Sequence, residues 1–269
     1  MTNDAPAEQH VDLAGGRVHL LRGGTGEPLL FLHAAGGAGA WLDFHRLLAG
    51  SFDVIAPDHP GFGRSDEFPA VEAVDDLVFH YLDVMDELGL ERPHVVGASF
   101  GGWIAAELAV TAPHRIASLV LLSPAGLRLP DHPVPDIFLM PPDQLVGTLF
   151  QHPPASADPP PAAPDIDAIL AAYRDQTALA RFCWSPYLCN PKLERRLHRI
   201  TAPTLVVAPA HDRLIPVAHA RRYAERIPGA RFTEIADCGH AMYFERPAEF
   251  ADVTREFVVT SGLPNGASR

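Results

Sequence analysis

The length, composition and charge of the chain exclude several classes of protein. Its 269 residues are 47% hydrophobic and 20% charged, which is ordinary for a globular protein, and the length suits one α/β domain with a large core. The 33 acidic and 21 basic residues give a net charge of −12. This charge disfavours nucleic acid and anionic membrane surfaces as partners, because both are themselves negative.

The N-terminus and the cysteines favour a cytoplasmic location. Residues 1–10, "MTNDAPAEQH", lack the basic and apolar regions of a signal peptide, and no apolar run approaches the ~20 residues that span a bilayer. The three cysteines, Cys183, Cys189 and Cys238, cannot all pair, and their spacing is not that of a zinc site. We therefore expect reduced thiols in a cytoplasmic protein.

Apolar runs near the N-terminus predict short strands. They cover residues 17–24, 28–37 and 52–58. The second and third runs are continuously apolar, which is typical of strands that are buried on both faces of a sheet.

Helices and strands alternate after these runs. Apolar residues at helical spacing predict a helix over residues 71–90, and a second helix over 103–112 ends at Pro113. The other expected elements are strands over residues 94–99, 116–126, 203–212 and 230–240, and helices over 217–227 and 247–260. This alternation predicts an α/β fold, in which a mostly parallel sheet is covered by helices on both faces.

A proline-rich segment, residues 127–200, interrupts the alternation. Prolines are densest over 151–165, and helical patterns follow over 166–182 and 191–197. We interpret this segment as an inserted cap with helices of its own. The core is then formed by residues 1–126 and 201–269.

The stretch Gly97-Ala98-Ser99-Phe100-Gly101 has the pattern G-x-S-x-G between a predicted strand and a predicted helix. In that context the pattern is typical of a nucleophilic serine. The glycines leave room for a sharp turn, and strained backbone angles at Ser99 would hold its hydroxyl above the edge of the sheet. The alternative interpretation is a serine that only forms a turn.

A nucleophilic serine needs a base and a group that orients the base. His240 and Asp212 follow the last two predicted strands, and the carboxyl ends of parallel strands meet at one edge of the sheet. The chain order Ser99, Asp212, His240 also matches a hydrolase triad on such a sheet. Asp237 is the alternative acid, but it lies only three residues before His240, so we favour Asp212.

Two backbone N–H groups are needed to stabilise the oxyanion of a serine hydrolase. We expect one from Phe100, which follows the nucleophile. The second is expected from Ala35, with Ala34 as the alternative, because small residues in "LHAAGGAGAW" (32–41) let the backbone approach a substrate. His33 is interpreted as an anchor of this loop.

The chain resembles the α/β-hydrolase fold superfamily over nearly its whole length. The resemblance is carried by residues 33–37, 58–66 and 97–102 and by the loops of Asp212 and His240. It implies an active site under a helical cap inserted between strands six and seven, without a metal or organic cofactor. The partner that it implies is a small-molecule substrate, and a homodimer is left open.

Ser99 distinguishes the chain from dehalogenases and epoxide hydrolases of this superfamily, which have aspartate at that position. We predict a serine hydrolase that cleaves a carboxylic ester or lactone through an acyl-enzyme on Ser99. A member of the fold that binds a small molecule without catalysis is a second alternative.

Carbon–carbon hydrolases of aromatic degradation, which act on dienolic diketones, are the first alternative. Segments 33–41 and 237–240 resemble theirs, but Ala34 and Ala35 replace glycines and Ala241 replaces a tryptophan. Such enzymes hold the acidic substrate with a cap arginine. The candidates are Arg174, Arg181, Arg195 and Arg196, for each of which a surface role is favoured.

Aromatic and sulfur-containing side chains near the elbow, in the cap and after the histidine favour an apolar or aromatic acyl group. The expected pocket residues are Trp103, Phe138, Met140, Trp184 and Met242.

Overall fold

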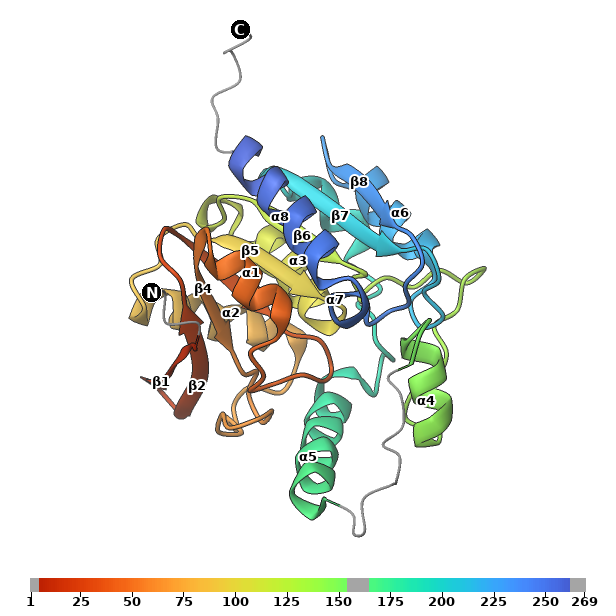
Figure 1. The fold of residues 1–269 in the computed structure, drawn as a ribbon, viewed down its shortest axis with the longest axis horizontal. Helices are drawn as coiled ribbons and strands as arrows, with labels where there is room; N and C mark the ends of the chain where they lie inside the picture. The colour runs from red at the N-terminus through yellow and green to blue at the C-terminus, as the bar shows by residue number, and fades with distance from the viewer. Residues whose placement is uncertain (1–4, 154–164, 262–269) are drawn as a thin grey trace, which may run out of the picture.

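A single eight-stranded sheet organises the molecule (Figure 1). The computed structural model describes residues 5–153 and 165–261. The strands are β1 (Ala7–Leu13), β2 (Gly16–Gly23), β3 (Glu27–Leu32), β4 (Phe52–Pro57), β5 (His94–Ala98), β6 (Leu119–Leu122), β7 (Thr204–Pro209) and β8 (Arg231–Ile235). Their spatial order is β1-β2-β4-β3-β5-β6-β7-β8. β2 pairs antiparallel with β1 and β4, and the remaining pairs are parallel.

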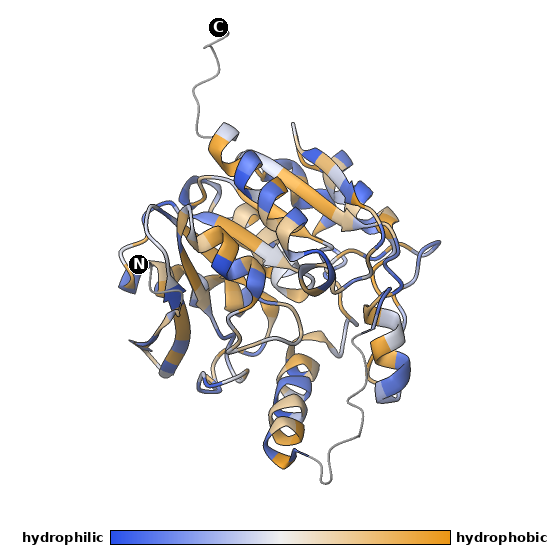
Figure 2. Cartoon of the chain, in the orientation of Figure 1, coloured by the Kyte–Doolittle hydropathy of each residue, from blue (hydrophilic) through white to orange (hydrophobic). Residues whose placement is uncertain are grey.

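Helices cover both faces of the sheet because its strands are apolar on both faces. In β3, Leu30 and Leu32 pack on one side, whereas Leu29 and Phe31 pack on the other. The first face is covered by α2 (Val74–Glu87), α3 (Phe100–Thr111) and α6 (Val217–Arg226), and the second by α1 (Asp43–Ala49) and α8 (Pro247–Ser261). Hydrophobic residues accordingly concentrate in the central strands (Figure 2).

The predicted α/β architecture with a mostly parallel sheet is confirmed. The sequence patterns do not predict β1, α1 or α4 (Pro142–Leu149). Helix α1 has only seven residues, too few to show a helical period. Helix α4 lies among prolines, but Pro142 is its first residue, where proline is tolerated because the N–H has no partner within the helix.

Helix boundaries also differ from prediction. Helix α3 begins at Phe100, directly after the serine, rather than at Trp103. The pattern over 191–197 forms a 3-10 helix, η2 (Glu194–Arg199), and a short helix α7 (Met242–Glu245) precedes α8. A 3-10 turn of three residues, η1, follows α3 at Pro113–Arg115.

Segment 127–200 lies between β6 and β7 and contains α4, α5 (Ile166–Cys183) and η2. Most of its proline-rich run falls outside the described residues. Helix α4 buries none of its residues, and α5 buries only four near its C-terminal end, so the N-terminal part of α5 projects from the body (Figure 1). Within the described ranges, each helix is too short or too polar to cross a membrane.

Candidate active site

A sharp turn between β5 and α3 presents Ser99. Its backbone angles, φ +52° and ψ −110°, are rare for a residue with a side chain. Close contacts explain the flanking glycines: a Cβ at Gly97 would collide with the Gly101 carbonyl oxygen, and a Cβ at Gly101 would collide with the Leu32 carbonyl oxygen. The turn therefore depends on glycine at both positions.

Ser99, His240 and Asp212 are brought together at the carboxyl edge of the sheet. His240 Nε2 lies 2.9 Å from Ser99 Oγ, and His240 Nδ1 lies 2.9 Å from Asp212 Oδ2. The other oxygen of Asp212 accepts the N–H groups of Leu214 (2.9 Å) and Ile215 (2.8 Å). This orientation of Asp212 gives His240 the Nδ1–H tautomer and leaves Nε2 free to accept the serine proton.

Sequence reasoning missed Ser123, which follows β6. Its hydroxyl donates to Asp212 Oδ2, the oxygen that also accepts from His240. Ser123 Oγ is also 3.4 Å from His240 Nδ1. Its φ of +42° is unusual for a serine. A serine after an apolar strand resembles any turn residue, so its only signal was its place at the end of a strand.

Asp237, the alternative acid, is exposed and turned toward other partners. Its Oδ1 lies 2.7 Å from His152 Nε2, and its Oδ2 accepts from the Arg246 guanidinium. The hydrogen bond from His152 lowers the pKa of the Asp237 carboxyl. Asp237 thus links the loop that carries His240 to His152, which follows α4.

Asp237→Asn is expected to keep kcat for p-nitrophenyl butyrate within about threefold of wild type at pH 7, because surface ion pairs contribute little. Steady-state kinetics on the purified variant checks this. A loss as large as that of Asp212→Asn would contradict the assignment of Asp212 as the acid.

The backbone near Ser99 offers donors for an oxyanion. Among the described residues, the N–H groups of Phe100, Ala34 and Ala35 donate no hydrogen bond within the protein. Phe100 begins α3, where the first N–H groups of a helix have no partner in the helix. These groups are therefore available to a substrate.

Two buried histidines anchor the loop after β3. His33 Nε2 accepts the N–H of His59 (2.9 Å), so Nδ1 carries the proton that is donated to the Ala34 carbonyl (2.6 Å). His59 Nε2 donates to the His33 carbonyl (2.8 Å), and its Nδ1 accepts from the Tyr81 hydroxyl. Burial lowers the pKa of both histidines, which keeps both rings neutral.

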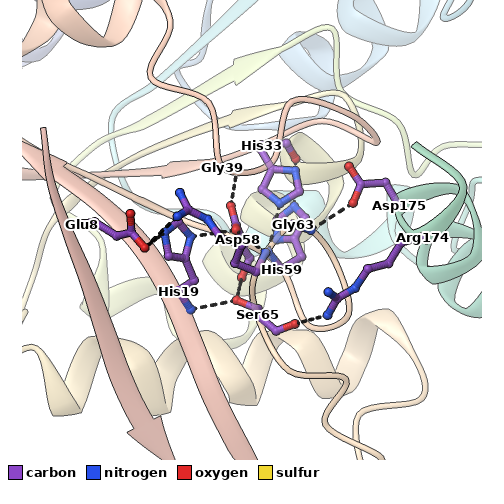
Figure 3. Close-up of polar contacts among 11 residues, drawn as sticks. Glu8, His19, His33, Gly39, Asp58, His59, Gly63, Ser65, Arg174 and Asp175 are labelled. Carbon is purple, nitrogen blue, oxygen red and sulfur yellow. Dashed lines mark hydrogen bonds and ion pairs between the residues drawn. The ribbon is translucent and has the colours of Figure 1, made fainter. Parts of the chain in front are cut away.

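Asp58 also holds the loop after β3 in place (Figure 3). Its carboxylate is buried and accepts from His19 Nδ1 (2.8 Å) and from the N–H groups of Gly39 (2.5 Å) and Arg64 (2.9 Å). Gly39 belongs to the loop after β3, and Arg64 to the loop after β4 (residues 58–69). The two loops are thereby held together beside Ser99.

Helix α5 contacts the loop after β4 through charged side chains (Figure 3). Arg174 donates to the carbonyls of Gly61 (3.1 Å) and Ser65 (2.7 Å), and Asp175 accepts the N–H of Gly63 (3.0 Å). Arg181 donates to the carbonyls of residues 67–69 at 3.0–3.1 Å. Arg174 and Arg181 are therefore engaged with the core, and Arg195 and Arg196 lie in η2.

The end of α4 contacts the loops of Asp212 and His240. The N–H of Ala241 donates to the Leu149 carbonyl (2.9 Å), and Arg213 donates to the carbonyls of Gly147 (3.0 Å) and Phe150 (3.2 Å). A Cβ at Gly239 would lie 2.7 Å from the Leu149 carbonyl oxygen. Segment 127–200 thus touches the loops that carry Asp212 and His240.

The expected pocket residues lie in different places. Phe138 and Trp184 are neighbours, with ring centroids 5.5 Å apart, and Trp184 is 63% exposed. Met140 is half-buried and contacts Thr148. Trp103 and Met242 are buried in the two core clusters on opposite faces of the sheet. Only the first three lie in segment 127–200.

Metal-ligating residues do not gather in the part of the chain that is described: it contains no group of three or more His, Cys, Asp or Glu side chains placed to hold an ion.

Comparisons with known proteins show which family and which proteins this chain is similar to. The model of the alpha/beta hydrolase family matches residues 29–253. The chain is 31% identical to the dihydrolipoyllysine-residue acetyltransferase component of the acetoin cleaving system of Cupriavidus necator, over 91% of this chain and 67% of that protein. It is 28% identical to a 2-hydroxy-6-oxo-6-phenylhexa-2,4-dienoate hydrolase of Burkholderia cepacia, over 91% and 92%. A solved serine hydrolase involved in carbazole degradation has a TM-score of 0.76 at 25% identity, covering 95% of this chain and all of that one.

Proposed function

Because the chain belongs to the alpha/beta hydrolase family, we propose that it is a serine hydrolase that cleaves a carbon–carbon bond of a 2-hydroxy-6-oxo-dienoate. The hydrogen-bonded series from Ser99 through His240 to Asp212 supports the serine mechanism. The Burkholderia cepacia relative, similar over almost the full length of both chains, supports the substrate class. The alternative from the sequence thus replaces an ester or lactone as the favoured substrate.

The substrate must ketonise before its bond can break. The proton of the C2 hydroxyl moves to C5, which leaves a C2 ketone conjugated to a C3=C4 double bond. An electron pair released at C5 is then delocalised onto the C2 oxygen. The C5 fragment becomes a feasible leaving group only in this form.

Ser99 attacks the C6 carbonyl carbon while His240 Nε2 takes the serine proton. The N–H groups of Phe100 and Ala35 stabilise the resulting oxyanion. When the oxyanion collapses, the C5–C6 bond breaks, and His240 gives its proton to the departing dienolate. Water, activated by His240, then hydrolyses the acyl group on Ser99 and releases a carboxylic acid.

An ester or lactone hydrolase is the second candidate, and the contacts of segment 127–200 favour it. Arg174 and Arg181 donate to backbone carbonyls of the core, so neither is free of protein partners to hold a substrate carboxylate. An ester needs no such cation, because its leaving group is an alcohol. The same three residues would catalyse its cleavage.

The two candidates are separated by kinetics with 2-hydroxy-6-oxo-6-phenylhexa-2,4-dienoate and p-nitrophenyl butyrate. Loss of the absorbance of the conjugated dienolate, with formation of benzoate, reports carbon–carbon cleavage. We expect a higher kcat/KM for the dienoate. Ester turnover without dienoate turnover would replace the proposal by the second candidate, and binding without turnover of either would favour a non-catalytic role.

An organophosphonate ester is expected to label Ser99 alone, because only a serine with a hydrogen-bonded base is activated. His240→Ala is expected to prevent labelling. Mass spectrometry of the digested protein locates the adduct. Labelling of another serine, or equal labelling of His240→Ala, would contradict the assignment of the nucleophile and base.

A further inference from the structure

A cavity lies at the base of segment 127–200. Its volume is about 660 Å³, within the range of small-molecule sites. It lies between residues 127–134, which follow β6, and residues 185–189, which follow α5, with His219 of α6 also in its wall. Ser99, Asp212 and His240 do not line it.

The wall of the cavity is largely apolar. Leu127, Leu129 and Cys189 are buried, yet each lines the cavity, and Val134 is half-buried. The three prolines of the wall, Pro130, Pro133 and Pro186, restrict the backbone around it. The apolar part of a ligand would find a preformed surface here.

The charge in the wall is positive, although the protein carries a net charge of −12. Arg128 lines the cavity, is exposed, and makes no hydrogen bond or ion pair with any described residue, and no Asp or Glu lines the cavity. Tyr187 of the wall already has protein partners: it donates to the Pro135 carbonyl (2.7 Å) and accepts the N–H of Ile137 (2.9 Å).

His219, which also lines the cavity, adds no charge to its wall. His219 is buried, and its Nε2 donates to the His132 carbonyl (2.8 Å). Burial lowers the pKa of His219, so its ring is neutral and adds no charge. The Arg128 guanidinium therefore supplies positive charge to the wall. Burial raises the pKa of the Cys189 thiol, and the charge of Arg128 opposes part of that rise.

We propose that this cavity binds an apolar monocarboxylate, with its hydrocarbon part against Val134 and the three prolines of the wall and its carboxylate on the Arg128 guanidinium. A carboxylate forms paired, charge-assisted hydrogen bonds with a guanidinium. The site is separate from the triad and does not depend on the proposed reaction.

Isothermal titration calorimetry with 4-phenylbutyrate tests the proposal on the whole protein. We expect saturable binding that Arg128→Gln weakens about twofold to fivefold, as for loss of one exposed ion pair. Arg128→Lys keeps the charge and is expected to lie between the two. The matched control is Arg199→Gln, because Arg199 is also an exposed arginine but does not line the cavity.

Two further measurements localise the ligand and define its class. Val134→Trp places a larger side chain where the hydrocarbon part is proposed to lie and is expected to weaken binding, while p-nitrophenyl butyrate turnover by this variant stays at the wild-type rate. The neutral analogue 4-phenylbutan-1-ol is expected to bind more weakly than the acid. Equal effects of Arg128→Gln and Arg199→Gln, wild-type affinity of Val134→Trp, equal affinity for the alcohol, or no binding by the wild type would each overturn the proposal.

Discussion

Replacing Ser99 by alanine is expected to lower kcat for p-nitrophenyl butyrate by about 10⁴- to 10⁶-fold, because the acyl-enzyme can no longer form. His240 and Asp212 remain in place, since the exchange removes only one oxygen. Ser51→Ala is the control, because Ser51 is exposed and belongs neither to the triad nor to the loops described around it. Turnover by Ser99→Ala within tenfold of wild type would exclude Ser99 as the nucleophile.

Ser99→Gly is expected to lose the same activity but to raise stability. A side chain at φ +52° and ψ −110° costs about 1–3 kcal/mol, and glycine removes this strain. The added freedom of glycine in the unfolded chain costs about 0.5–1 kcal/mol, so the strain term is larger. We expect Tm to rise by about 2 °C, measured by thermal denaturation. A lower Tm than that of Ser99→Ala would mean that the turn is not strained.

The sequence predicts the triad because each member follows an apolar run. Ser99, Asp212 and His240 come after β5, β7 and β8, and a parallel sheet brings such positions to one edge. The resemblance to the α/β-hydrolase superfamily, which rests on the same segments, is confirmed by the match over residues 29–253. Local sequence patterns are therefore enough to predict where a residue lies when its position follows directly from the arrangement of the strands in the sheet.

The sequence does not predict contacts that depend on packing between distant irregular segments. Asp175 meets Gly63 across 112 positions of the chain, and no local pattern marks either residue. Met242 follows His240 closely, but the first turn of α7 directs it into the core between the sheet and α1 and α8. Side-chain direction in such segments is set by tertiary packing, which a single sequence does not display.

Asp212→Asn is expected to lower kcat by about 10⁴-fold without unfolding the protein. Oδ1 of Asp212 accepts two backbone N–H groups, so the oxygen of an asparagine would take that place. Its NH₂ group would then face His240 Nδ1 and donate to it. His240 would carry its proton on Nε2, where it could not accept the proton of Ser99. A variant with more than a tenth of wild-type kcat would exclude this role of Asp212.

Ser123→Ala is expected to lower kcat/KM for p-nitrophenyl butyrate by about tenfold, because Asp212 loses one of the donors that hold it against His240. The Ser123 hydroxyl and His240 Nδ1 share Asp212 Oδ2, so removal of the hydroxyl leaves that oxygen one donor fewer. Steady-state kinetics on the purified variant checks this. If Ser123 acts through Asp212, the double variant Ser123→Ala/Asp212→Asn loses no more activity than Asp212→Asn alone, whereas two losses that add in full would show that Ser123 does not act through Asp212.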